Sequence, residues 1–133
     1  RAIKSQPRPC AKTTGLANVI KQALCRLPEE RREHEVKKTQ QRVFQAIRIA
    51  VNDEFTVLDQ FLRLLPWCLK PGGRAAILTF HSGEDNRVKQ AFESGLAEKL
   101  YSSISLNPIR PSPEERQANP RSSCARLRWA VRT

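Results

Sequence analysis

A cluster of polar residues directly follows the short apolar run Ala75–Phe80. His81, Ser82, Glu84 and Asp85 occupy four of the five positions from 81 to 85. Imidazole, hydroxyl and carboxylate groups can orient a substrate or move protons, and histidine titrates near neutral pH. The spacing also suits a helix start, because Ser82 can cap the first turn while Asp85 faces the positive end of the helix dipole. A simpler interpretation is that Ser82 and Asp85 are only caps and His81 is a turn histidine.

The surrounding sequence predicts the elements that would position this cluster. Pro71–Gly73 indicates a turn, and the apolar run after it has the length of a strand buried on both faces. A helix beginning near the glutamate would bury Val88, Ala91 and Phe92 at helical spacing. In open α/β sheets the ligand crevice lies at the carboxyl ends of strands, where residues 81–85 would lie. The bend is therefore the best candidate for a site.

Helical periodicity dominates the chain before this strand. Helices are predicted over residues 13–27, 42–51 and 52–66, with a charged, solvated helix or loop over 29–41. We expect Thr13 or Thr14 to cap the first helix, and Pro66 to end or kink the third.

Strand signals return after the helix that follows the bend. Tyr101–Ile109 predicts an irregular strand, and Ser112–Glu115 combines a cap, a proline and a glutamate at the spacing of a helix start. Ala125–Arg132 alternates apolar and basic residues, which predicts a strand near a sheet edge with one basic face.

Length and composition restrict the class of protein. The 133 residues suffice for one domain at most, and a net charge of +11 indicates a polyanionic partner. The ends of the chain carry this excess and the middle does not. The four cysteines and two histidines lack zinc-site spacing, and no apolar run approaches the roughly 20 residues of a membrane-spanning helix. Because the chain lacks methionine and starts at Arg1, we expect a processed chain or a fragment.

Three stretches, in this order, resemble the bacterial-type ribosomal small-subunit RNA (cytosine-N4)-methyltransferase family. They are RVFQAIRIAVNDEF (42–55), LKPGGRAAILTFHSGEDNRVKQAF (69–92) and ANPRSSCARLRWAVR (118–132). The segment TTGLANVIKQAL (13–24) is similar to the helix that precedes them in that family. The most specific parts are FHS-ED within 80–85 and NPR-S-AR-R within 119–128.

The resemblance implies an α/β fold, namely the C-terminal part of a Rossmann-like methyltransferase domain preceded by part of a helical insertion. Residues 1–51 would belong to the insertion and residues 52–133 to the methyltransferase domain. Such enzymes use S-adenosylmethionine, whose glycine-rich loop and other contacts would lie upstream, so no residue here is assigned to the cofactor or to a metal. Gly72–Gly73 agrees, because it precedes a strand, whereas a cofactor loop follows a strand and opens a helix.

The implied reaction is methyl transfer to the exocyclic amine of a cytosine in small-subunit ribosomal RNA. We expect catalysis by a full-length protein rather than by this chain alone, in the cytoplasm or in an organelle with bacterial-type ribosomes. His81 and Ser82 are expected to border the pocket, and Glu84 and Asp85 to brace the bend. Phosphate contacts are expected from Arg42, Arg48, Arg121, Arg126 and Arg128. Solvated surface arginines are the simpler interpretation for part of this set.

The sequence departs from the family pattern at three places. Gly83 stands where leucine is usual, Asn86 adds a polar residue to the first helical turn, and residues 37–41 read KKTQQ in place of a His-Pro-Ala-Thr pattern.

One alternative function is that of a non-catalytic RNA-binding or ribosome-associated protein that retains this half of the fold. Salt-sensitive RNA binding without cofactor binding would favour it. A second alternative is a fragment without a function of its own.

Overall fold

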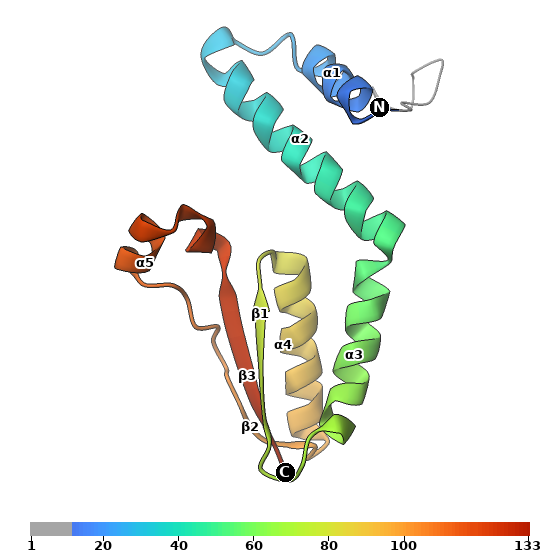
Figure 1. The fold of residues 1–133 in the computed structure, drawn as a ribbon, viewed down its shortest axis with the longest axis vertical. Helices are drawn as coiled ribbons and strands as arrows, with labels where there is room; N and C mark the ends of the chain where they lie inside the picture. Colours follow the sequence, from blue (N-terminus) through green and yellow to red (C-terminus); the bar gives the residue numbers. More distant parts are fainter. Residues whose placement is uncertain (1–11) are drawn as a thin grey trace. The chain divides into compact units, whose positions relative to one another are not determined.

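The computed structural model describes residues 12–133, which form helices and one three-stranded sheet (Figure 1). The elements in chain order are α1 (Thr13–Ala23), α2 (Glu29–Asn52), α3 (Glu54–Cys68), β1 (Arg74–Thr79), α4 (Ser82–Ala97), β2 (Tyr101–Ile104), α5 (Pro113–Ala118), the 3-10 helix η1 (Pro120–Cys124) and β3 (Arg126–Arg132). The chain divides into two compact units, residues 1–54 and 55–133. The start of the predicted insertion segment, residues 1–11, lies outside the described residues. None of the helices described has the length and apolar character needed to cross a membrane.

In the first unit, α1 packs against α2. Leu16, Val19 and Ile20 are buried, and the Gln40 side chain of α2 donates a hydrogen bond to the Ala17 carbonyl (3.2 Å). The expected threonine cap is wrong. Both threonines lie inside the helix, so Lys12 occupies the cap position. Its side chain makes no cap bond, since an ammonium group has no hydrogen-bond acceptor.

The charged segment and the amphipathic segment after it form one helix, α2, rather than a linker and a helix. Nothing between residues 41 and 42 breaks helical geometry, and two glutamates in the first turn suit the helix dipole. The predicted break after this helix is confirmed. Asp53 adopts a left-handed conformation (φ 50°, ψ 38°), which ends α2 at Asn52, and α3 begins at Glu54.

In the second unit, β3 is the central strand of the sheet. The strand order is β1-β3-β2, and both pairs are antiparallel. The prediction that Ala125–Arg132 lies near an edge is therefore wrong. The alternation of apolar and basic residues along β3 indicates which side chains share a face of the sheet. It does not indicate how many strands pair with β3. β2 is shorter than expected, and Ile109 returns to the sheet as an isolated bridge with Leu127.

The core of this unit lies on one face of the sheet, under α3 and α4. Its buried apolar residues are Leu62 and Leu65 of α3, Ala75 of β1, Val88 and Phe92 of α4, Tyr101 and Ile104 of β2, and Ala130 of β3. On the opposite face Leu78 is 53% exposed. Phe80, just beyond the end of the strand, is 52% exposed. The prediction that β1 is covered on both faces is therefore wrong for the residues described.

Two proline signals had different outcomes. Pro66 does not end α3, which continues to Cys68 with the proline buried in its last turn. Pro113 opens α5 as predicted, and the Ser112 hydroxyl accepts a hydrogen bond from the Glu115 amide (3.1 Å). A proline at the first helical position removes only an amide that has no intrahelical partner, which explains the second outcome.

Candidate active site

The bend between β1 and α4 is closed by His81 rather than by Ser82. His81 occupies the cap position with an extended backbone, and its Nδ1 accepts a hydrogen bond from the Glu84 amide (3.3 Å). The His81 carbonyl accepts a second hydrogen bond, from the Asp85 amide (3.1 Å). The predicted serine cap is wrong because the helix begins one residue earlier than that role requires, and Ser82 is the first helical residue, exposed to solvent.

Glu84 joins both sides of the bend. Its Oε2 accepts a hydrogen bond from the Phe80 amide (3.1 Å), and its Oε1 lies 2.9 Å from Nε2 of His81. This second approach is a close polar contact without hydrogen-bond geometry, and Nε2 is buried with no hydrogen-bond partner among the described residues. Because Nδ1 is an acceptor, the proton of a neutral His81 ring lies on Nε2. Glu84 thus contacts residues on both sides of the bend that it is expected to brace.

Phe55, in the first turn of α3, forms a wall beside the bend. Its ring meets the His81 ring edge-to-face, with centroids 5.9 Å apart, and the Arg87 guanidinium lies 4.3 Å from the Phe55 centroid. A β-carbon at Gly83 would stand 2.9 Å from Phe55 Cζ and 3.2 Å from His81 Nδ1. Gly83 therefore permits this close approach. The sequence analysis did not anticipate the contact between Phe55 and the histidine.

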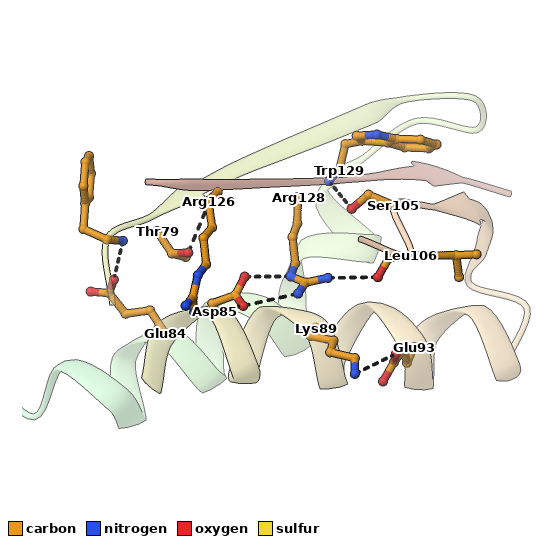
Figure 2. A network of polar contacts seen from close by, with 11 residues as sticks. Thr79, Glu84, Asp85, Lys89, Glu93, Ser105, Leu106, Arg126, Arg128 and Trp129 are labelled. Carbon is orange, nitrogen blue, oxygen red and sulfur yellow. Dashed lines mark hydrogen bonds and ion pairs between the residues drawn. The ribbon is translucent and has the colours of Figure 1, made fainter. Parts of the chain in front are cut away.

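Asp85 is held from the sheet by two arginines of β3, as Figure 2 shows. Arg128 Nε lies 2.7 Å from Asp85 Oδ1 and Nη2 lies 3.2 Å from Oδ2, while Arg126 Nη1 lies 3.3 Å from Oδ2. Trp129 points to the other side of the strand. Asp85 and Arg128 are both buried, at 5% exposure each.

The environment of Asp85 favours its charged form. Burial by itself raises the pKa of this carboxyl, but the hydrogen bond and charge of Arg128, with the charges of Arg126 and Arg110, outweigh it and hold the pKa below its ordinary value of 3.8. Asp85 is thus an anchoring anion rather than an acid. Its spacing to Val88 and Phe92, i, i+3 and i+7 on the buried side of α4, was the available signal that this carboxylate points inward.

The five arginines expected to contact phosphates fall into different environments. Arg42 and Arg121 are exposed, and Arg48 forms an ion pair with Glu54 (2.9 Å). Arg126 is partly exposed, and its Nε is buried without a hydrogen-bond partner among the described residues. Arg128 is inaccessible in this structure, since Asp85 and the Leu106 carbonyl engage its guanidinium.

The glycine turn before β1 does not provide a cofactor cradle. The Gly72 amide donates to the Arg132 carbonyl (3.0 Å) and the Gly73 amide to the Lys70 carbonyl (2.8 Å), and the turn leads into a strand. Its amides are therefore not aimed at an anionic group in the way that a helix-opening loop provides. Across residues 12–133, histidine, cysteine and acidic side chains nowhere gather in threes as a metal site would need.

Comparison with known proteins gives one consistent result. The model of the MraW methylase family matches residues 1–133. The chain is 53% identical over 120 residues to "Ribosomal RNA small subunit methyltransferase H 1" of Agathobacter rectalis, covering 90% of this chain and 34% of that protein. It is 50% identical over 127 residues to "Ribosomal RNA small subunit methyltransferase H" of Crocosphaera subtropica, covering 96% and 38%. The chain thus spans about a third of the length of these relatives. With the family model matching throughout, the chain belongs to the MraW methylase family.

Proposed function

We propose that this chain is the C-terminal part of an S-adenosylmethionine-dependent methyltransferase that modifies the N4 amine of a cytosine in small-subunit ribosomal RNA. The observation that carries the proposal is the family match over residues 1–133, together with the names of relatives about half identical to it. The Rossmann-like fold, the division at residues 51 and 52, and the action on bacterial-type ribosomes in a cytoplasm or organelle belong to the same proposal.

The bend after β1 is proposed as one wall of the reaction pocket. The cofactor would supply an electrophilic methyl group, and the residues that hold it are proposed to lie outside this chain. The cytosine amine must point at that methyl group and must lose a proton as the new bond forms, so positioning accounts for much of the rate. His81 and Ser82 would border the base, and Glu84 and Asp85 would fix the bend that presents them.

The geometry of His81 narrows its proposed role. Nδ1 accepts a hydrogen bond from the Glu84 amide, and Nε2 is buried 2.9 Å from Oε1 of Glu84. Accepting a proton at Nδ1 would break the helix cap. We therefore assign His81 to shaping the pocket and not to removing the proton.

The arginines with accessible guanidinium groups are proposed to contact RNA phosphates. Arg42 and Arg121 are exposed, and Arg126 is partly exposed beside the bend. Arg48 would exchange its Glu54 partner for a phosphate. Arg128 is left out of this set because its guanidinium is buried.

The test is methylation by a purified full-length protein that contains this chain. Small ribosomal subunits from cells lacking the activity are incubated with the protein and methyl-labelled S-adenosylmethionine, and the digested nucleosides are separated by mass spectrometry. The proposal predicts N4-methylcytidine. Labelling at another atom or of another RNA refutes it, and salt-sensitive RNA binding without any methyl transfer would favour the non-catalytic RNA-binding alternative.

A further inference from the structure

Arg128 contacts two segments, the bend of the candidate site and the segment that follows β2. Its Nε and Nη2 donate to Asp85 at the start of α4, and its Nη1 donates to the Leu106 carbonyl (3.4 Å) just after β2. We propose that Arg128 is a positioning residue, which fixes the bend 80–85 and the segment 105–109 in one arrangement for catalysis without touching the substrate. This proposal rests on the function proposed above.

On the side of the bend, Asp85 transmits the position of Arg128 to His81. The Asp85 amide donates to the His81 carbonyl (3.1 Å), and the preceding amide, that of Glu84, donates to the His81 side chain (3.3 Å). Glu84 and Asp85 both belong to the first turn of α4, where helical hydrogen bonds link their backbones. A displaced Asp85 carboxylate would therefore displace the turn that carries the histidine ring.

On the other side, the segment 105–109 is fastened to β3 at two points. Ser105 exchanges hydrogen bonds with the Trp129 backbone (2.9 and 3.0 Å), and Ile109 exchanges backbone hydrogen bonds with Leu127 (2.8 and 3.0 Å). Arg128 lies between these two strand residues, and its side chain holds the Leu106 carbonyl that lies between the two fastenings. The segment and the bend are thereby tied to the same guanidinium.

The bend and the segment 105–109 also contact β3 at the same end of the sheet. Thr79, the last residue of β1, is paired with Arg126, and the neighbouring Leu127 is bridged to Ile109. The Thr79 hydroxyl donates to the Arg126 carbonyl (3.3 Å), which closes this end beside the bend. A single buried side chain can therefore align the bend and the segment 105–109 with each other.

The geometry of the guanidinium, more than its charge, is what the proposal requires. Arginine presents its donors in a planar fork that matches a carboxylate on one side and a carbonyl on the other, whereas lysine offers a single charged point on a flexible stem. Arg128→Lys keeps the charge that Asp85 needs and removes the fork. It is therefore the informative variant.

The test combines hydrogen exchange and kinetics on the full-length protein carrying Arg128→Lys. We expect faster amide exchange in peptides covering 80–85 and 105–109 together, with little change in the second half of α4. We expect kcat for RNA methylation to fall about 10- to 100-fold while the KM values for RNA and cofactor change less than about threefold. Glu93→Gln is the matched control, since it removes an exposed contact with Lys89 (3.7 Å) on the same helix and should change neither readout.

Other outcomes overturn the proposal. Faster exchange in only one of the two segments would contradict the coupling, and an unchanged kcat with both segments loosened would contradict the positioning role. If Arg128→Lys does not fold, the nearly isosteric Asp85→Asn is measured by the same two readouts. If the wild-type protein methylates no RNA, the proposed function fails, while the exchange measurement still decides whether Arg128 couples the two segments.

Discussion

The guanidinium of Arg128 and the carboxylate of Asp85 meet through two contacts of 2.7 and 3.2 Å between side chains 43 positions apart in the chain. Both side chains are buried, so the pair joins the central strand to the first turn of α4 from within the core. A buried pair of this kind is costly to break, because removing one partner leaves an uncompensated charge in the interior.

Replacing Asp85 by asparagine should destabilise the protein at neutral pH and change its response to acid. The folded pKa of Asp85 is lowered from 3.8, so its ionised form stabilises the fold above that value, and the contribution is lost as the pH falls from about 4 through the lowered pKa. We expect a loss of about 3 kcal/mol at pH 7. Urea unfolding of both proteins between pH 2 and 7 measures this, and parallel pH curves with a constant offset would contradict it.

Gly95 should not tolerate a methyl group, although it lies inside a helix. A β-carbon there would stand 2.6 Å from Cδ2 and 2.7 Å from Cε2 of Tyr101, whose ring packs against Phe92 with centroids 5.4 Å apart. We expect Gly95→Ala to cost about 1–3 kcal/mol of unfolding free energy through overpacking. Gly15→Ala in α1 is the matched control, because nothing lies within 4 Å of its β-carbon and the change should stabilise by about 0.5–1 kcal/mol. Equal effects at the two sites would contradict the packing argument.

Gly83 and Phe55 should be coupled. Gly83→Ala would press a β-carbon against Phe55 Cζ at 2.9 Å, so the ring must move away from His81. We expect a loss of about 1 kcal/mol, reduced by a second change, Phe55→Leu, which shortens the opposing side chain. Thermal unfolding of the four proteins of this cycle measures the coupling energy. Additive effects would show that the ring and the glycine do not constrain each other.

Local signals predicted much of the secondary structure, because their causes lie within a few residues. The cap at Ser112, the proline after it and the helix break after Asn52 depend on backbone geometry that neighbouring residues determine. The sheet order did not follow from such signals. The central place of β3 results from pairing with residues 26 to 57 positions away, which its own alternation does not encode.

The bend between β1 and α4 was predicted from the sequence, but only some of its contacts were. The bend at 81–85 was identified from the order of strand, polar residues and helix, and the histidine, glutamate and aspartate do interact with the residues around that bend. Arg128 was assigned to a basic face because charged residues in a strand usually point to solvent. The buried Asp85 reverses that preference by supplying a partner in the core, and only the tertiary structure brings these two residues together.

His81 variants should separate capping from pocket formation. Asparagine is a good helix cap and alanine a poor one, so His81→Asn should retain most of the stability that His81→Ala loses, about 1 kcal/mol. If the imidazole also borders the base, both variants should lose methylation activity by a similar factor. Thermal unfolding and single-turnover methylation by the full-length protein give the two numbers. Normal turnover in a folded His81→Ala protein would remove this residue from the mechanism.

The exposed arginines should differ from other surface cations in their effect on RNA binding. Arg42→Gln and Arg121→Gln should each weaken binding and lower the salt dependence, the slope of log K against log salt concentration, by about 0.7 for each phosphate of single-stranded RNA that the variant no longer neutralises. Lys89→Gln on α4 is the control, because it also removes one surface charge, and its nearest described partner is Glu93. Binding is measured by fluorescence anisotropy with a small-subunit RNA fragment at several salt concentrations. If all three variants shift the curves equally, net charge alone attracts the RNA and neither arginine binds a defined phosphate.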